Sequence, residues 1–225
     1  MPHFALPTVE LLNLAVGGLL LTAVLVLWRR ELPVVVQVFA AQGVALAGLT
    51  AVLAWVEGSA ELGVVAAGVL VLRGGVLPWL LRRALVGRGA VATGRRETHP
   101  TLNVAASLLA AAALTLLAMT VSAPLVELAP SPAARAVPLA IAVVLIGFLV
   151  LVTRRQAVSQ LVGFLLMDNG ITAAGFLTTA GIGLVVEVGV ALDVLLVVLV
   201  LGVLAGRMRE AFGGTDLGEL RELRD

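Results

Sequence analysis

The chain has no cysteine among its 225 residues. This absence excludes disulfide bonds, thiolate-held iron–sulfur clusters and cysteine-based zinc sites. Histidine is nearly absent as well, because only His3 and His99 occur, and both lie in predicted connections without ligand spacing. The sequence therefore predicts that the chain holds no metal and no haem of its own.

Charged residues are also scarce, at 13% of the chain, whereas apolar residues make up 60% and the mean hydropathy is +1.11. These values far exceed those of a soluble domain, so we predict an all-α, polytopic membrane protein. Windows of about 20 apolar residues divide the chain into about seven transmembrane helices. The predicted spans are residues 8–28, 33–56, 62–81, 102–122, 137–153, 157–178 and 183–206.

The predicted helices fall into two groups followed by a tail. Residues 1–136 form an N-terminal four-helix membrane region, residues 137–206 a three-helix region, and residues 207–225 a cytoplasmic tail. The amino-terminal stretch lacks the positively charged start of a secretory signal and leads into a full-length apolar run, so we interpret it as a helix. The polar connections are too short to bury a core of their own.

The arginines predict the orientation of these helices. All 15 basic residues are arginine, and most of them fall on alternate connections, which the positive-inside rule assigns to the cytoplasm. These cytoplasmic residues are Arg29, Arg30, Arg82, Arg83, Arg88, Arg95, Arg96, Arg154, Arg155, Arg207, Arg209, Arg221 and Arg224. The opposite connections carry Glu57, Glu61 and Glu127 with the lone Arg135. We therefore expect a multi-pass protein of the cell inner membrane, with its amino terminus outside and its carboxyl terminus in the cytoplasm. Topology accounts for the arginines, so no nucleic-acid partner is expected.

Three carboxylates stand inside the last two long apolar runs: Asp168 in LVGFLLMDNGITAAGFL, and Glu187 and Asp193 in GIGLVVEVGVALDVLLVVLVLGVLAG. An ionised group at the centre of a transmembrane helix costs roughly 2.5 to 3.5 kcal/mol, so each acid needs a partner, water or a proton. We interpret the three as a proton or ion relay. In an antiparallel hairpin turning near Gly181, Asp168 and Asp193 would lie roughly 18 to 20 Å from the turn and could face one another. Glu187 would lie nearer the turn.

Arg73 stands near the centre of the third predicted helix, in VLRGGVLPWLL, where it supplies a supporting charge. The two glycines and Pro78 that follow it weaken a regular helix. A buried arginine stays protonated, so it acts as a fixed charge rather than as a proton carrier. The sequence does not identify its partner. It also leaves open that the acids are neutral, or paired with Arg73, and serve packing alone. Asn169, next to Asp168, is a supporting polar residue that could hydrogen-bond a carboxylate or water.

Several other residues favour packing explanations. We predict close helix approaches at Gly17, Gly18, Gly43, Gly63 and Gly68, interhelical hydrogen bonds from Gln37, Gln42, Asn103, Ser107 and Thr115, and interfacial anchors at Trp28, Trp55 and Trp79. No glycine pattern follows a strand and opens a helix as a dinucleotide site requires, so no nucleotide cofactor is expected.

Two strings of the carboxyl-terminal half, GFLLMDNGI and VEVGVALDVLLVVLVLGVL, resemble the hydrogenase-4 component E family of membrane subunits. Over roughly residues 137–225, the chain is similar to subunit K of respiratory complex I and to the corresponding small membrane protein of the multisubunit cation/proton antiporters. The first four predicted helices fit the family by number, by hydropathy and by the basic residue in the third.

The resemblance implies a noncatalytic membrane-arm subunit of a complex-I-like assembly, such as an energy-converting nickel–iron hydrogenase or a formate hydrogenlyase. Its partners would be antiporter-like membrane subunits in the lipid bilayer and hydrogenase or other redox subunits on the cytoplasmic side, and it would hold no cofactor. Asp168 matches the acid of the family's Glu-Asn-Gly pattern, and Glu187 and Asp193 match acids of the last helix. The resemblance leaves open which of these two is the second acid, and whether the ion is H⁺ or Na⁺.

Two other function classes stay open. A stand-alone secondary transporter would place its binding groups at broken helices related by an internal repeat, and we find no convincing repeat between the two halves. A purely structural membrane subunit of a cation/proton antiporter complex is the other alternative. Such a subunit would tolerate asparagine at all three acid positions.

Overall fold

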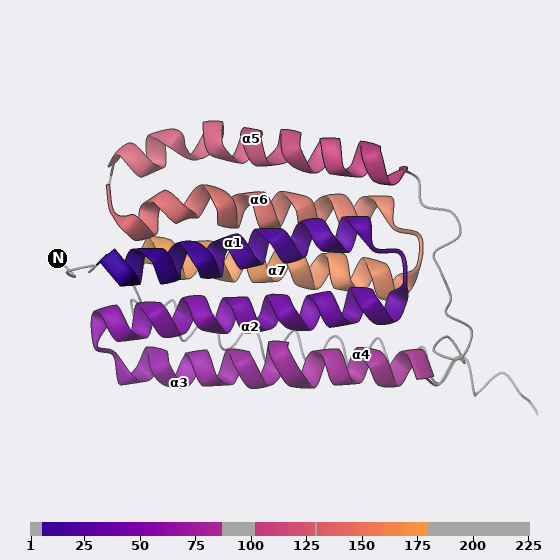
Figure 1. The fold of residues 1–225 in the computed structure, drawn as a ribbon, viewed down its shortest axis with the longest axis horizontal. Helices are drawn as coiled ribbons and strands as arrows, with labels where there is room; N and C mark the ends of the chain where they lie inside the picture. Colours follow the sequence, from indigo (N-terminus) through magenta and orange to yellow (C-terminus); the bar gives the residue numbers. More distant parts are fainter. Residues whose placement is uncertain (1–5, 87–101, 129, 180–225) are drawn as a thin grey trace, which may run out of the picture. The chain divides into compact units, whose positions relative to one another are not determined.

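The computed structural model describes residues 6–86, 102–128 and 130–179, and every element in these ranges is helical (Figure 1). The all-α prediction is therefore confirmed for this part of the chain. The elements are α1 (Leu6–Trp28), α2 (Leu32–Glu57), α3 (Ala60–Val69), the π-helix η1 (Leu70–Val76), α4 (Leu77–Val86), α5 (Val104–Leu128), α6 (Pro132–Thr153) and α7 (Ala157–Thr179). All of them belong to one compact unit, Met1–Val186, whereas the second unit, Glu187–Asp225, lies outside the described residues.

Six helices in the described ranges are long and apolar enough to cross a membrane, which is the behaviour of a multi-pass membrane protein. They are Pro7–Trp28, Leu32–Glu57, Ala60–Arg83, Val104–Leu128, Pro132–Thr153 and Val158–Thr178. They correspond to the first six predicted spans. The seventh predicted span, residues 183–206, and the tail lie outside the described residues.

Side-chain caps set where several helices begin. The Ser59 hydroxyl accepts a hydrogen bond from the Leu62 N–H at 3.3 Å, and the Ser131 hydroxyl accepts one from the Ala134 N–H at 3.0 Å. These bonds satisfy N–H groups that have no partner in the first helical turn. The cap at Ser131 and the proline that follows it start α6 at Pro132, earlier than the predicted residue 137, because proline is favoured in the first turn.

The third span is a single helix that changes its winding in the middle. It runs as α3 to Val69, continues as η1, and resumes as α4 at Leu77. The Leu77 N–H bonds to the Leu72 carbonyl, five residues back, as in a π-helix. Pro78 follows directly and has no N–H to offer, which explains why regular α-helical bonding is interrupted here. The predicted weakening of the helix after Arg73 is confirmed.

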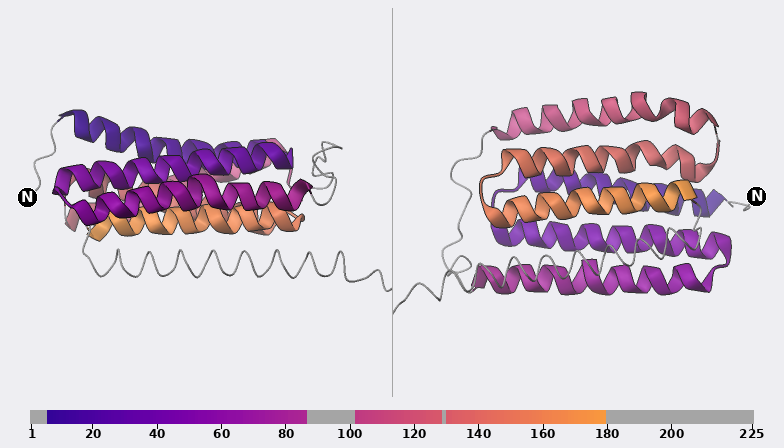
Figure 2. Two further views of the ribbon diagram at one scale, coloured as in Figure 1. Left: turned by 90° about the horizontal axis from the view of Figure 1, so that it is seen from below. Right: turned by 180° about the vertical axis from the view of Figure 1, so that it is seen from behind.

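The helices lie nearly side by side in the first compact unit (Figure 1). Helix α5 contacts α6, and α2 contacts the third span through α3, η1 and α4. Helices α1 and α7 each contact both α6 and α2. They do so from opposite faces, as the rotated views in Figure 2 show. Helix α2 is therefore surrounded by α1, α7 and the third span, and its side chains form the centre of this unit.

Glycines allow the closest approach in the unit, between α6 and α7. A Cβ added at Gly147 would lie 2.4 Å from the Met167 nitrogen, and one at Gly170 would lie 2.7 Å from the Val144 nitrogen. Among the glycines predicted to permit close approach, only Gly43 does so tightly. An added Cβ at Gly18 would make an ordinary contact at 3.5 Å. At Gly17, Gly63 and Gly68 it would meet no atom within 4 Å, so the prediction is wrong for these positions.

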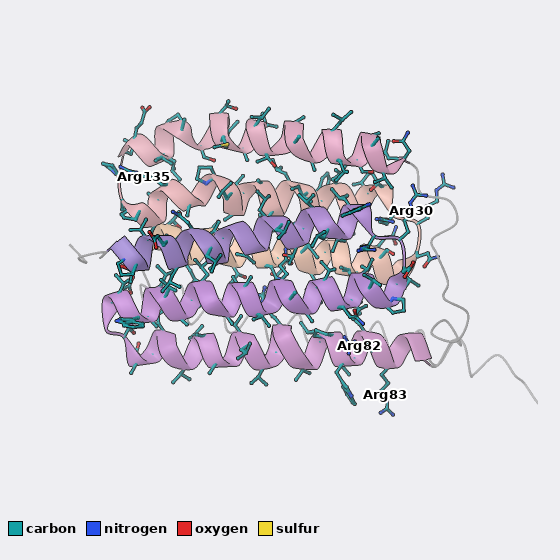
Figure 3. The ribbon with its side chains drawn as sticks, in the orientation of Figure 1. Arg30, Arg82, Arg83 and Arg135 are labelled. Atoms are coloured by element: carbon teal, nitrogen blue, oxygen red, sulfur yellow. The ribbon has the colours of Figure 1, made fainter. Side chains whose placement is uncertain are left out.

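The arginines of the connections gather at the ends of the helices. In Figure 3, Arg30, Arg82 and Arg83 lie toward one end and Arg135 lies at the other. Trp28 is exposed with the Arg29 guanidinium 5.2 Å from its ring centre, and Arg83 is similarly placed 5.6 Å from the ring centre of Trp79. Exposed tryptophans near helix ends are typical of residues at a membrane–water interface.

Candidate functional site: a buried arginine–aspartate cluster

The described chain places one buried charge cluster among its helices, centred on Arg73. The Arg73 side chain is 2% exposed and projects from η1, near the middle of the third span. On α7, Asp168 and Thr172 are four residues apart and therefore lie on the same face of that helix, with Asn169 beside them. The cluster thus joins two helices that are distant in sequence.

Arg73 binds the side chains of α7 with both terminal nitrogens. Its Nη2 lies 2.6 Å from Asp168 Oδ2 and donates to Thr172 Oγ1 at 3.1 Å, and its Nη1 donates to Asn169 Oδ1. Asp168 is 22% exposed, whereas Asn169 is only 1% exposed. The arginine is therefore the enclosed member of the ion pair, and the carboxylate reaches the edge of the cluster.

A chain of amides extends the cluster through α2 to α1. Asn169 Nδ2 donates to Gln42 Oε1 at 2.9 Å, and Gln42 Nε2 donates to the Leu19 carbonyl at 3.3 Å. Because a carbonyl can only accept, the Leu19 oxygen orients the Gln42 amide, and Gln42 in turn orients Asn169. The Asn169 oxygen is left facing the guanidinium. Four helical segments thus contribute to one polar network.

The backbone of the arginine is held as tightly as its side chain. A Cβ added at Gly43 on α2 would lie 2.5 Å from both the carbonyl carbon and the carbonyl oxygen of Arg73. Only glycine allows η1 and α2 to approach this closely. The close contact brings the Arg73 backbone next to Gln42, the neighbour of Gly43 in sequence, and fixes the distance that the guanidinium must reach to α7.

The physical reason for the pairing is the location of the charges. A lone arginine or aspartate at the middle of a membrane-crossing helix costs roughly 2.5 to 3.5 kcal/mol, and pairing removes the net charge. Breaking a buried pair by removing one partner typically costs about 3 to 5 kcal/mol, since it leaves an uncompensated charge. The pair can therefore hold the third span against α7.

The structure brings together three of the five predicted site residues: Arg73, Asp168 and Asn169. It identifies Asp168 as the partner of Arg73, which the sequence had left open. Asn169 binds Arg73 and Gln42 rather than the carboxylate or water considered in the sequence analysis. Glu187 and Asp193 lie outside the described residues, so their placement in the relay stays a prediction. In the described ranges, no group of three or more His, Cys, Asp or Glu residues could hold a metal ion.

Sequence reasoning missed Thr172 and assigned Gln42 to packing alone. The position of Thr172 four residues after Asp168 was the available signal. Among the other predicted interhelical hydrogen bonders, Gln37 is exposed, Asn103 caps α5, and Ser107 and Thr115 bond to carbonyls of their own helix or its cap. The prediction is therefore confirmed for Gln42 and wrong for the bonds that these three residues make. A hydroxyl in an apolar helix often bonds to the carbonyl one turn earlier, which satisfies it without a neighbour.

A second buried arginine lies near one end of the helices. Arg154, immediately after α6, is 5% exposed, and its Nη2 donates to the carbonyls of Val26, Leu27 and Arg29 at 2.9 to 3.0 Å. These carbonyls end α1, where the last turn has no N–H partners and the helix dipole is negative. The sequence analysis counted Arg154 as a topology marker only, but it also caps α1.

The comparisons with known proteins place the chain in a family. The chain is 50% identical over 215 residues to "Uncharacterized protein Rv0085" of Mycobacterium tuberculosis, and the match covers 96% of each chain. The chain belongs to the family of this mycobacterial protein. No protein-family profile matches the chain. No solved structure matches it either.

Proposed function

We propose that this chain is a noncatalytic membrane-arm subunit of a complex-I-like energy-converting nickel–iron hydrogenase or formate hydrogenlyase, and that it contributes Asp168 to a proton or ion path. The observation that carries the proposal is the Arg73–Asp168 pair, at 2.6 Å, near the middle of two helices long enough to cross a membrane. Ionisable residues at this depth are rare and mark ion pathways in membrane proteins. The resemblance of the strings around Asp168 supplies the class of assembly.

The two members of the pair have different roles in this path. Arg73 is enclosed and stays protonated, so it is a fixed positive charge. Asp168 is partly exposed and is the member that exchanges a proton. Proton binding changes the net charge of the pair from zero to plus one, so the proton occupancy of Asp168 responds to a charge that approaches or departs on a neighbouring protein of the assembly. Glu187 and Asp193 continue the path in this proposal.

The proposed topology is seven spans in the cell inner membrane, with the amino terminus outside and the carboxyl terminus in the cytoplasm. The arrangement of the described arginines supports this orientation, because Arg30, Arg82 and Arg83 lie toward one end of the helices and Arg135 at the other (Figure 3). Redox subunits would then bind on the arginine-rich side, and antiporter-like subunits would contact the exposed apolar faces within the bilayer.

A second candidate function is a purely structural membrane subunit. The observation that favours it is the number of helices that the polar network joins, since Arg73, Asn169 and Gln42 link the third span to α7, α2 and α1. The two candidates differ at Asp168. A structural role is retained by asparagine wherever the protein still assembles, whereas a proton path is not.

The test of the assembly is purification of the tagged chain from its native host in a gentle detergent, with the co-purified proteins identified by mass spectrometry. Recovery with nickel–iron hydrogenase or complex-I-like subunits is the expected result. Recovery of the chain by itself, as a monomer or homo-oligomer, would contradict the proposal and support a self-contained transporter.

A further inference from the structure

The guanidinium of Arg73 lies among side-chain oxygens that all come from α7. A carboxylate oxygen of Asp168, the amide oxygen of Asn169 and the hydroxyl oxygen of Thr172 each contact one of its terminal nitrogens. Carboxylate, amide carbonyl and hydroxyl oxygens are also the ligands that hard metal cations take in proteins. The three oxygens therefore have the chemistry of a small-cation site, and a covalently attached cation occupies it.

We propose that Arg73 is a built-in cation that fills this oxygen site and excludes alkali-metal ions, so that the ion exchanged at Asp168 is the proton. The exclusion of metal ions follows from the contacts of Arg73 alone. The second half of the statement, that an ion is exchanged at Asp168, rests on the proposed function. Arg73 is thereby the residue that determines ion specificity at this position.

Electrostatic repulsion is the first reason for the exclusion. A sodium ion bound to the Asp168 carboxylate would lie close to the guanidinium, which already contacts the same carboxylate at 2.6 Å. Two unit charges about 4 Å apart, at an effective dielectric constant of about 20, weaken binding by about 1,000-fold. A sodium ion at the Asp168 carboxylate would face this repulsion as long as Arg73 stays in place.

The second reason is that Arg73 cannot easily withdraw. Its side chain is 2% exposed, and its backbone is pressed against Gly43, where an added Cβ would lie 2.5 Å from the Arg73 carbonyl. A metal ion needs several oxygens at once, and the guanidinium holds Asn169 and Thr172 as well as Asp168. A proton needs only one carboxylate lone pair. Asp168 can therefore bind a proton while Arg73 keeps its two neutral acceptors.

The test uses the purified full-length chain in detergent and measures its thermal unfolding midpoint. Sodium, potassium or guanidinium chloride, at up to tens of millimolar, is compared with N-methylglucamine chloride at equal ionic strength. A cation that binds only the folded state raises the midpoint in proportion to the logarithm of its concentration. The wild type should show the same midpoint in all four salts. Arg73→Ala should unfold at a lower temperature in N-methylglucamine and regain part of the loss in at least one of the small cations.

Two controls separate site binding from general salt effects. Arg83→Ala removes an exposed arginine from the same span and should leave the midpoint independent of the cation. Arg73→Ala combined with Asp168→Asn removes the carboxylate and should lose the response to small cations. These comparisons involve neither partner proteins nor transport, so their outcome is distinct from failure of the proposed assembly.

Two results would overturn the inference. One is a wild-type chain that sodium stabilises over N-methylglucamine and that loses this response in Asp168→Asn. The other is a folded Arg73→Ala chain that is indifferent to sodium, potassium and guanidinium. Where Arg73→Ala does not fold, the wild-type comparison still decides, because an occupied site requires the wild type to be indifferent to sodium.

Discussion

Gly43 on α2 and Arg73 on η1 meet backbone to backbone, so closely that a Cβ at position 43 would lie 2.5 Å from the Arg73 carbonyl carbon. This contact sets how far the guanidinium extends toward Asp168. A glycine in the interior of a transmembrane helix, which would otherwise weaken it, is explained by this approach. The packing of α2 against the third span and the position of the charge pair are therefore one feature.

Gly43→Ala should lower the stability of the protein, because its methyl group forces apart two backbones that have no flexible side chain between them. Overpacking of this kind typically costs about 1 to 3 kcal/mol. Gly48→Ala on the same helix is the matched control, since an added Cβ there meets no atom within 4 Å. Thermal unfolding of both variants in detergent measures the effect. Equal unfolding temperatures for the two variants would refute the close contact.

The Arg73–Asp168 pair should show strong energetic coupling in a double-mutant cycle. Asp168→Asn leaves Arg73 buried beside neutral acceptors, and Arg73→Met leaves the carboxylate without its cation. Each single change should cost about 3 to 5 kcal/mol, and the double variant should lose clearly less than the sum. Unfolding free energies of the four proteins give the coupling. Additive losses would mean that the two side chains do not interact.

Gln42→Leu should destabilise the protein by about 1 to 3 kcal/mol, because it leaves the buried Asn169 amide without its acceptor. Gln37→Leu on the same helix is the matched control, since the Gln37 side chain is exposed. In a membrane protein, that exposed change should be nearly neutral. Thermal unfolding of the pair distinguishes the two positions, and an equal effect at both would argue against the amide chain.

The comparison between Gln37 and Gln42 also shows what the sequence could and could not predict. Long apolar runs locate the helices, because crossing a membrane requires length and apolarity. Glycines and a proline after Arg73 predicted the change of winding in the third span, because their effect is local. Neither signal says which side of α2 faces its neighbours, so the two glutamines looked alike.

The charge pair could be predicted only in part for the same reason. Arg73 and Asp168 each announce a missing partner, since neither charge is stable alone in an apolar helix. The spatial order of helices decides that they meet, and nothing in one sequence reports that order. The tight glycines illustrate this further: Gly147 and Gly170 separate α6 from α7, yet they resemble Gly17 and Gly63, which contact nothing.

Arg154→Met should weaken the end of α1. The variant removes the donor to the carbonyls of Val26, Leu27 and Arg29 and should cost about 1 to 3 kcal/mol. Arg155→Met keeps the same change of residue type at a neighbouring exposed position and should have a smaller effect. Thermal unfolding and limited proteolysis after α1 both report the difference. Matching stability and cleavage of the two variants would contradict the cap.

The central claim is that Asp168 exchanges protons in a working assembly, and Asp168→Asn tests it in membrane vesicles from the native host. Hydrogen turnover and proton movement are measured on the same vesicles, with the amount of assembled complex determined alongside. We predict that the protons moved per hydrogen turned over fall at least about fivefold while assembled complex persists. Assembled Asp168→Asn complex with an unchanged ratio would contradict the account and leave the cluster a purely structural role.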